Sequence, residues 1–264
     1  MKDISDFFYH FKPDEKILTS SFLPTGLSNI NYHIITEQQH YLLKCYHNIL
    51  PITQLLAQKQ LAKKNIAPQV YGFNKANNTA LFDYVPGEIA SCVTISTIVE
   101  SLIQLHQFSS NSACMDLEAH FLPYKNLMEY TEFEEKIHSA LSLVNELPKS
   151  LGFCHNDLIK SNIINDGNQF ILIDFEYAQT NDIFFDLAAI ASSYQFDLQQ
   201  QDQLLNMYCK QTHLTINDDL AWQKLDIYNF IYNALCYLWY IDRGFNEAAI
   251  LALSQVKACD FYSK

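Results

Sequence analysis

Residues 152–178 read GFCHNDLIKSNIINDGNQFILIDFEYA, and the first part of this stretch contains a spaced set of polar residues. His155, Asp157 and Asn162 stand in the order H-x-D-x-x-x-x-N. This spacing puts an acid and an amide on one loop, where both side chains can serve the same reaction.

The second part of the stretch predicts a β-hairpin. The apolar run Ile-Leu-Ile at 171–173 is typical of a buried strand, and it ends in Asp174. The turn-forming run Asn-Asp-Gly-Asn at 165–168 comes before that strand. We therefore expect the chain to fold back and bring Asp174 beside Asn162.

These oxygen-bearing side chains suit phosphoryl transfer, and their spacing is that of a kinase catalytic loop. The reaction depends on positioning and charge neutralisation more than on covalent help from the protein. We predict that Asp157 is the catalytic base for a substrate hydroxyl, and that Asn162 and Asp174 are ligands of Mg²⁺. His155 is interpreted as a hydrogen-bonding brace of the loop. Asp and Asn also form turns and caps without any catalytic role, but the agreement of two motifs favours catalysis.

The rest of the chain predicts a small sheet followed by a mainly helical part. Short strands are expected at 16–22, 31–35, 41–46, 69–73 and 79–85, with one helix between Pro51 and Pro68. The sequence Val-Pro-Gly at 85–87 marks the expected domain boundary. Beyond it, helices are expected at 93–107, 124–146, 182–194, 198–210, 217–241 and 245–261. We therefore predict an α+β protein with an antiparallel sheet in residues 1–85 and a larger helical part in residues 86–264.

The composition excludes several classes of protein. The 29 acidic residues against 17 basic ones give a net charge of -12, which repels nucleic acid and anionic membrane surfaces. The six glycines are too far apart for G-x-G-x-x-G or a Walker A loop, so Rossmann and P-loop folds are excluded.

The cysteines and the N-terminus predict a cytoplasmic protein. The seven cysteines are scattered without metal-ligand spacing, so we expect buried free thiols in a reducing compartment. The start MKDISDFFYHF lacks the charge and apolar run of a signal peptide, and no later run is long enough for a membrane helix. We expect no membrane insertion.

Two strings of this sequence resemble the choline and ethanolamine kinases. FCHNDLIKSNII at 153–164 and IDFEYAQTNDIFFDLA at 173–188 are similar to the corresponding segment of that family, which lies within the aminoglycoside phosphotransferase superfamily. The similarity extends to TGLSN at 25–29 and NIAP at 65–68. The resemblance implies a protein-kinase-like bilobal fold, with a nucleotide-binding N-terminal lobe and a C-terminal lobe that holds the catalytic loop and the substrate pocket.

The resemblance also implies how ATP is bound. The turn at 26–29 would lie over the phosphates, Lys44 would contact the α- and β-phosphates, and the backbone at 83–85 would meet adenine. The residues assigned to the nucleotide in this way are Gly26, Ser28, Asn29, Lys44, Asp83 and Val85. A lysine in YLLKCY also fits an edge strand that is protected by charge.

The sequence departs from the family pattern at the partner of the strand lysine. Protein kinases pair that lysine with a glutamate of the first helix, but residues 38–82 contain no acid. Gln54 or Gln58 is therefore expected to accept a hydrogen bond from Lys44 as a neutral replacement. The same departure favours, as an alternative, a module that binds nucleotide without efficient transfer. Asp186 lies in FDLA, and the resemblance implies that it supports the catalytic loop from the start of a helix.

The acceptor is predicted from the C-terminal region. Aromatic and apolar residues follow one another at helical spacing on one face, at Tyr228, Tyr232, Leu235 and Trp239. In choline kinases a similar segment forms an aromatic pocket for a quaternary ammonium group, which cation–π attraction stabilises. The same stripe also fits ordinary core packing.

The candidate substrate residues are Glu176, Tyr194 and Trp239. Cys236 stands where the family often has a second tryptophan, and Ser193-Tyr194 replaces the acid and aromatic residue expected after FDLA. We predict an ATP- and Mg²⁺-dependent phosphotransferase that acts on the hydroxyl of a small, cationic alcohol such as choline or ethanolamine. The alternatives are thiamine or an aminoglycoside as acceptor, a catalytically weak nucleotide-binding module, and a purely structural protein.

Overall fold

The computed structural model describes residues 4–24 and 28–261, and the chain divides into two compact units. The first unit comprises Met1–Ile89 and Ile163–Glu176, and the second comprises Ala90–Asn162 and Tyr177–Lys264. Each unit is described by itself below.

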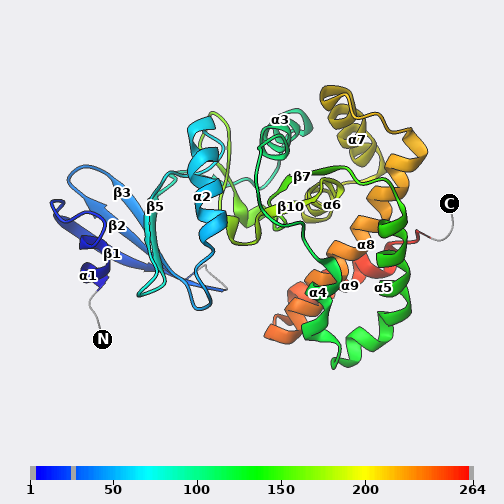
Figure 1. The fold of residues 1–264 in the computed structure, drawn as a ribbon, viewed down its shortest axis with the longest axis horizontal. Coiled ribbons are helices and arrows are strands. Elements are labelled where there is room, and N and C mark those ends of the chain that lie inside the picture. The colour runs from blue at the N-terminus through cyan, green and yellow to red at the C-terminus, as the bar shows by residue number, and fades with distance from the viewer. Residues whose placement is uncertain (1–3, 25–27, 262–264) are drawn as a thin grey trace. The chain divides into compact units, whose positions relative to one another are not determined.

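The first unit is built on a five-stranded antiparallel sheet, drawn in blue to cyan in Figure 1. The strand order is β1-β2-β3-β5-β4, and the strands are β1 (Ile17–Leu23), β2 (Ile30–Thr36), β3 (His40–Cys45), β4 (Val70–Asn74) and β5 (Thr79–Asp83). The five predicted strands are confirmed, with small differences at their ends. The register pairs Lys44 of β3 with Asn31 of β2 and with Ala80 of β5, so the predicted phosphate-binding lysine lies on the central strand of this sheet.

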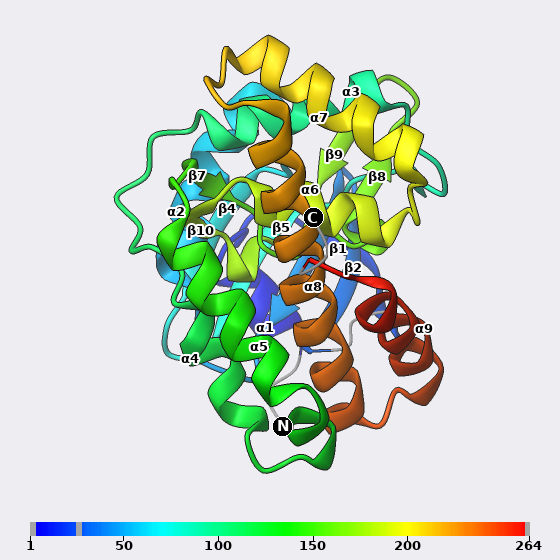
Figure 2. The same cartoon turned by 90° about the vertical axis from the view of Figure 1, so that its right-hand side faces the viewer.

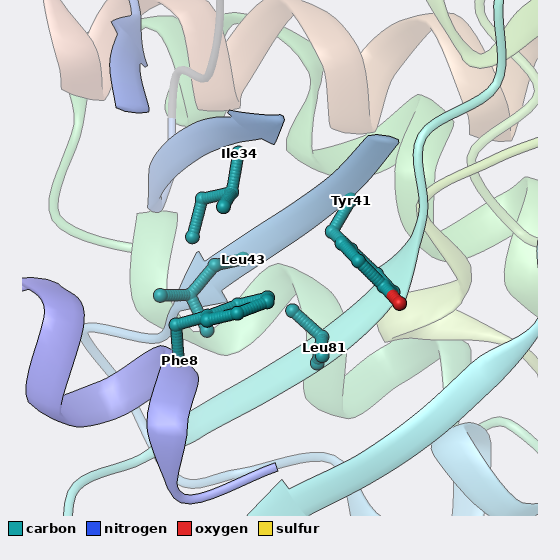
Figure 3. Close-up of a cluster of buried hydrophobic side chains, with 5 residues drawn as sticks. All are labelled: Phe8, Ile34, Tyr41, Leu43 and Leu81. Carbon is teal, nitrogen blue, oxygen red and sulfur yellow. The ribbon is translucent and has the colours of Figure 1, made fainter. Parts of the chain in front are cut away.

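One face of the sheet is covered by a short helix that the sequence analysis did not predict, α1 (Ile4–Tyr9). Its buried Phe8 packs with Ile34, Tyr41, Leu43 and Leu81, as Figure 3 shows. Tyr41 and Leu43 are two residues apart on β3 and therefore point to the same face of the sheet.

A second apolar cluster involves the predicted helix after Pro51, which is α2 (Ile52–Leu61). Leu55 of this helix packs with the buried residues Val70, Ala80 and Phe82 of the sheet. The helical segment ends in the 3₁₀ turn Ala62–Lys64, where Asn65 adopts a left-handed conformation with φ 59°.

A three-stranded sheet completes the first unit. It is formed by β6 (Glu88–Ile89), β8 (Ile163–Asn165) and β9 (Phe170–Leu172), in the order β6-β8-β9. The predicted turn between β8 and β9 is confirmed, because Asp166 Oδ1 accepts hydrogen bonds from the backbone N–H groups of Asn168 and Gln169. Gly87 has φ +142°, and a Cβ there would collide with the backbone oxygen of Asn165, so this close approach requires glycine.

The second unit is mainly helical. Figure 2 shows α8 running through it, and α5, α6 and α9 pack against α8. The helices are α3 (Ile95–His106), α4 (Leu117–Phe121), α5 (Met128–Glu146), α6 (Phe184–Ser193), α7 (Leu198–Thr212), α8 (Asp218–Arg243) and α9 (Asn246–Ala258). The six predicted helices are confirmed, but the one predicted to start at 124 starts at Met128. The preceding residues form α4 and the 3₁₀ turn Leu122–Tyr124, in which proline occupies an early position.

A two-stranded sheet, β7 (Leu151–Cys154) with β10 (Gln179–Asp182), carries the catalytic-loop sequence at its edge. A buried ion pair fastens α8 to this sheet: Lys224 Nζ lies 2.7 Å from Asp182 Oδ2 and also donates to Pro148 O and Ser150 Oγ. These hydrogen bonds compensate the buried ammonium group.

The seven cysteines are free thiols, as predicted. The expectation that they are all buried was wrong, because Cys92 and Cys114 lie in exposed connecting segments. Across residues 4–24 and 28–261, none of the helices has the length and apolar character needed to cross a bilayer.

Candidate active site

Lys44 is the centre of the predicted site in the first unit. Its side chain is only 6% exposed, and its Nζ lies 2.5 Å from Asp174 Oδ1 and 3.5 Å from Glu176 Oε2. The ammonium group also lies 5.1 Å from the ring centroid of Tyr46. A lysine buried to this extent requires charged partners, and the two carboxylates supply them.

The expectation that a glutamine of α2 serves Lys44 was wrong for Gln58. Its side chain is buried and donates to the backbone oxygen of Pro68 at 3.1 Å. The acids come instead from the segment after β9, and Asp174 is 130 positions from Lys44 in sequence. The first helix, which the sequence analysis expected to provide the partner, provides neither of them. The sequence analysis assigns Asp174 to the metal alone and does not predict its ion pair with Lys44.

Burial and neighbouring charges shift the pKa values of Lys44 and Glu176. Burial acts to lower the pKa of Lys44, but the nearby charges of Asp174 and Glu176 act in the opposite direction and raise it above its ordinary value. Burial raises the pKa of Glu176, and the proximity of Asp174 adds to this, while Lys44 and Asn29 act to lower it. Lys44 is therefore an ammonium group at neutral pH.

Asp174 directly follows the apolar strand β9, as predicted, and it adopts a left-handed conformation with φ 65°. This conformation costs free energy for a residue other than glycine, and such positions cluster at functional sites. Asn162 belongs to the second unit, so the expectation that Asp174 lies beside it stays a prediction.

The turn predicted to cover the phosphates is described in part. Gly26 lies outside the described residues, and Ser28 is half-buried just before β2. Asn29 donates from Nδ2 to Glu176 Oε2 at 2.6 Å, and its Oδ1 accepts a hydrogen bond from the backbone N–H of His47 at 3.3 Å. Asn29 is thus linked to Glu176, one of the two carboxylates beside Lys44.

The segment predicted to meet adenine follows β5. The backbone N–H of Asp83 donates to Gln69 O, and the N–H of Tyr84 donates to His40 O. The Asp83 carboxylate accepts a 2.5 Å hydrogen bond from the hydroxyl of Tyr71. Val85 comes next and is half-buried.

In the second unit, the catalytic-loop sequence is held by Asp186. This side chain is completely buried in the first turn of α6 and accepts from the backbone N–H groups of His155 at 2.7 Å and Asn156 at 2.8 Å. The role implied for Asp186 by resemblance, support of the loop, agrees with these bonds. Asn156 is left-handed with φ 64°, and its Nδ2 donates to Tyr177 O at 2.9 Å.

Asp157 and Asn162 lie together at the end of this loop. Asn162 donates from Nδ2 to both the backbone oxygen and Oδ2 of Asp157, each at 2.9 Å. Because both bonds use the nitrogen, Oδ1 is the atom of Asn162 that can ligate a cation. The loop is further fixed by the backbone N–H of Lys160, which donates to Ser193 Oγ at 2.8 Å.

Two residues behind Asp186 were missed by sequence reasoning. His106, at the end of α3, has Nε2 3.2 Å from Asp186 Oδ2 and Nδ1 2.7 Å from the hydroxyl of Tyr208 on α7. Since the carboxylate can only accept, Nε2 of His106 donates the hydrogen bond to Asp186. Neither residue has a motif of its own, so no signal in a single sequence could have found them.

His106, Asp186 and Cys154 also offer nitrogen, oxygen and sulfur atoms that lie within 4.8 Å of one another. Hydrogen bonds already use these groups: Asp186 accepts from three N–H groups, and the Cys154 thiol lies 3.6 Å from Asn181 O. Burial raises the pKa of the Cys154 thiol well above its ordinary value. These hydrogen bonds account for the close approach of the three side chains.

The aromatic stripe of α8 divides into two parts. Tyr228 and Tyr232 are buried and make edge contacts with Phe185, so this part packs in the core. Trp239 is half-buried and stacks on Phe245, with ring centroids 5.7 Å apart.

The charge of Asp157 affects the pKa values of three side chains on α8. Burial, with the charge of Asp157 as a further cause, raises the pKa values of Cys236 and Tyr240 to about 12 and that of Tyr232 well above its ordinary value. These residues stand at i, i+4 and i+8 and therefore share one helix face. Sequence reasoning named Tyr232 and Trp239 for this region but not Tyr240 or Phe245.

Tyr194, the other aromatic candidate, has a different environment. Its hydroxyl donates to Ala90 O at 2.8 Å, and Lys160 Nζ lies 5.0 Å from its ring centroid. Its hydroxyl is thus used by a backbone contact within the second unit.

Comparison with known proteins identifies the class of this chain. The family model for choline/ethanolamine kinase matches residues 21–220, so the chain belongs to the choline/ethanolamine kinase family. Protein LicA of Haemophilus influenzae is 35% identical over 88 residues, which are 33% of this chain and 33% of LicA. The human choline/ethanolamine kinase is 24% identical over 218 residues, or 67% of this chain and 55% of the human protein. The chain thus matches between a third and about half of the length of these curated relatives.

Solved structures confirm the predicted fold. Choline kinase LicA from Streptococcus pneumoniae has a TM-score of 0.76 at 18% identity and covers 96% of both chains. An aminoglycoside phosphotransferase has a TM-score of 0.72 at 11% identity and covers 97% of both chains. The α+β, protein-kinase-like fold, with an antiparallel sheet in one unit and mainly helices in the other, is therefore shown.

Proposed function

We propose that this protein transfers the γ-phosphoryl group of ATP to the hydroxyl of a small cationic alcohol, with choline or ethanolamine as the leading acceptor. The observation that carries the proposal is the catalytic loop, in which a buried Asp186 holds the backbone while Asn162 holds Asp157. Family membership supports the reaction class.

The reaction needs the groups that the two units carry. The acceptor oxygen attacks the γ-phosphorus, the bond from that phosphorus to the β–γ bridging oxygen breaks, and ADP leaves. Asp157 takes the hydroxyl proton, and Asn162 fixes the carboxylate that receives it. Lys44 compensates negative charge on the phosphates, because it is a buried ammonium group on the central strand of the sheet. Ser28 and Val85 are the further candidates for nucleotide contacts, at the phosphate turn and at adenine.

The side chains present fit a magnesium ion. Mg²⁺ prefers hard oxygen ligands, so Asp174 of the first unit, with Glu176 as a further carboxylate, and the Oδ1 atom of Asn162 of the second unit would be the groups that hold it. When bound, the ion neutralises charge on the β- and γ-phosphates. The cysteine thiols play no part in this ligand set.

A cationic acceptor is favoured by the aromatic face near Asp157. The aromatic rings of Tyr240, Trp239 and Phe245 are of the kind that attracts a quaternary or protonated amine, and the Arg243 guanidinium already lies 5.5 Å from the Trp239 ring centroid. The similarity to a choline kinase and to a choline/ethanolamine kinase supports this choice. The similar structure of LicA in complex with AMP supports a nucleotide as the donor.

A coupled ADP-release assay with a panel of acceptors tests the proposal. Choline and ethanolamine are expected to raise ADP release in the presence of Mg²⁺, while thiamine and aminoglycosides serve as the competing acceptors. The Asp174→Ala variant should lose the signal, and Asp202→Ala, on the exposed face of α7, should keep it. Tight Mg-ATP binding without any acceptor-dependent release would instead identify a nucleotide-binding module, and the absence of nucleotide binding would refute the proposal.

A further inference from the structure

A chain of alternating donors and acceptors runs through the first unit from the phosphate turn to Lys44. Asn29 Nδ2 lies 2.6 Å from Glu176 Oε2, Glu176 Oε2 lies 3.5 Å from Lys44 Nζ, and Lys44 Nζ lies 2.5 Å from Asp174 Oδ1. The amide, the carboxylate, the ammonium group and the second carboxylate alternate in hydrogen-bonding character. Each member therefore depends on its neighbour.

The orientation of the Asn29 amide is determined by its second bond. The backbone N–H of His47 can only donate, so the atom of Asn29 that faces it must be the oxygen. The nitrogen must then face Glu176, where it donates to a charged acceptor. Hydrogen bonds to charged groups are about twice as strong as bonds between neutral groups.

Asn29 lies close to the strand that carries Lys44. Asn31 of β2 is opposite Lys44 of β3, and Asn29 stands two residues before Asn31, in the bend that directly precedes β2. Its Oδ1 accepts a hydrogen bond from the N–H of His47, two residues after the end of β3, so Asn29 lies beside the end of that strand. Glu176, in the 3₁₀ turn Phe175–Tyr177, meets both side chains there.

We propose that Asn29 is a positioning residue that holds the Glu176 carboxylate beside Lys44, and that it does not itself bind the nucleotide. The proposal rests on the proposed kinase function, because holding Glu176 in place matters if Lys44 must be held ready to bind phosphates. It assigns Asn29 a different role from the phosphate contact implied by sequence resemblance. Without the amide, Glu176 loses its strongest neutral partner and the ammonium group loses a fixed neighbour.

Reversing the direction of the hydrogen bond between residues 29 and 176 distinguishes positioning of Glu176 from direct contact with the nucleotide. Asn29→Asp places two carboxylates against each other, whereas Asn29→Asp combined with Glu176→Gln restores a bond of opposite direction between the same atoms. The dissociation constant for Mg-ADP and the value of kcat/KM for ATP are measured for the wild type, both single variants and the double variant. Asn74→Asp is the matched control, since it adds the same charge to the first unit and keeps the acceptor oxygen that binds the Ala76 N–H.

We expect Asn29→Asp to lower kcat/KM by about 10-fold or more, as for the loss of a hydrogen bond to a charged group. The double variant should exceed the product of the two single effects by about 10-fold. Effects that simply multiply would show that Asn29 acts independently of Glu176, as a direct nucleotide contact would, and would overturn the proposal.

The hydrogen bond between Asn29 and Glu176, called the Asn29 clamp below, is also tested without nucleotide. This test can refute the clamp without refuting the proposed kinase function. In ¹⁵N-labelled protein, the Asn29 side-chain amide signal should shift and lose its protection from hydrogen exchange in Glu176→Ala. An unchanged signal would refute the clamp even in an active kinase. A protein that neither binds Mg-ATP nor phosphorylates an acceptor would refute the kinase function, and the signal would still decide whether the clamp exists.

Discussion

The two units hold their functional groups by different means. In the first unit, Lys44 is held by the charges of Asp174 and Glu176, and the carboxylate of Asp174 is about one-third exposed. In the second unit, Asp157 is placed by a loop whose backbone is bonded to the completely buried Asp186. Ion pairs can exchange partners when a charged ligand arrives, whereas a buried network of satisfied hydrogen bonds is rigid. The lysine group is thus suited to receive phosphates and the loop to hold a base in place.

The largest expected effect is at the loop itself. Asp157→Ala removes the proton acceptor, and we expect kcat to fall by about 10²–10⁴-fold while the affinity for Mg-ADP stays unchanged. Steady-state kinetics together with calorimetric titration of Mg-ADP check this. A near-normal kcat would remove Asp157 from the catalytic role, and an equal loss in Asp202→Ala would point to a general effect of charge.

Among these variants, loss of the ion pairs of Lys44 with Asp174 and Glu176 should lower the free energy of unfolding most. Lys44→Met leaves two carboxylates without their cation, and we expect the free energy of unfolding to fall by about 3 kcal/mol, at the lower end for broken buried pairs because Asp174 is partly exposed. Urea unfolding measures it, with Lys59→Met on the exposed face of α2 as the control. A loss no larger than in the control would contradict the view that charge holds this group together.

Loss of the Asp186 hydrogen bonds that hold the catalytic loop should lower stability less than the loss of Lys44, and it should also lower turnover. Asp186→Asn replaces one acceptor oxygen with an N–H₂ group that faces N–H donors, and we expect about 2 kcal/mol lower stability. The loop then loses its fixed geometry, so kcat should fall more than the KM for ATP changes. Asp218→Asn, exposed at the start of α8, is the control, and unchanged kcat in Asp186→Asn would show that the loop does not need these hydrogen bonds.

The smallest effect is expected at Tyr194. Burial is the main cause that raises its pKa to about 12, and the hydroxyl must be protonated to donate to Ala90 O. A raised folded-state pKa means that the contribution to stability is complete below about pH 10 and is lost as the pH rises from 10 to about 12. Tyr194→Phe should therefore be about 1 kcal/mol less stable than the wild type at pH 8, with a smaller difference above pH 10. An increase in the KM for the acceptor would instead indicate direct contact with the substrate.

Sequence reasoning was most successful where the information is local. The alternation and turn residues around Lys44 and Asp174 predicted their strands and the β8–β9 hairpin, because pleat and turn chemistry depend on neighbouring residues. It failed at the partners of Lys44, since the ion pair joins residues 130 positions apart. The short elements α1, α4, β6 and β10 were also missed, because short segments have weak periodicity and depend on tertiary packing.

The sequence by itself determined the family, the order of strands and helices, and the spacing of Asp157, Asn162 and Asp174, because these follow from residue types at fixed separations along the chain. Only the tertiary structure decided that carboxylates and not a glutamine serve Lys44, that Asn29 is bonded to Glu176, and that His106 and Tyr208 lie behind Asp186. Buried polar groups must find partners wherever packing brings them, and packing joins segments that are far apart in the chain.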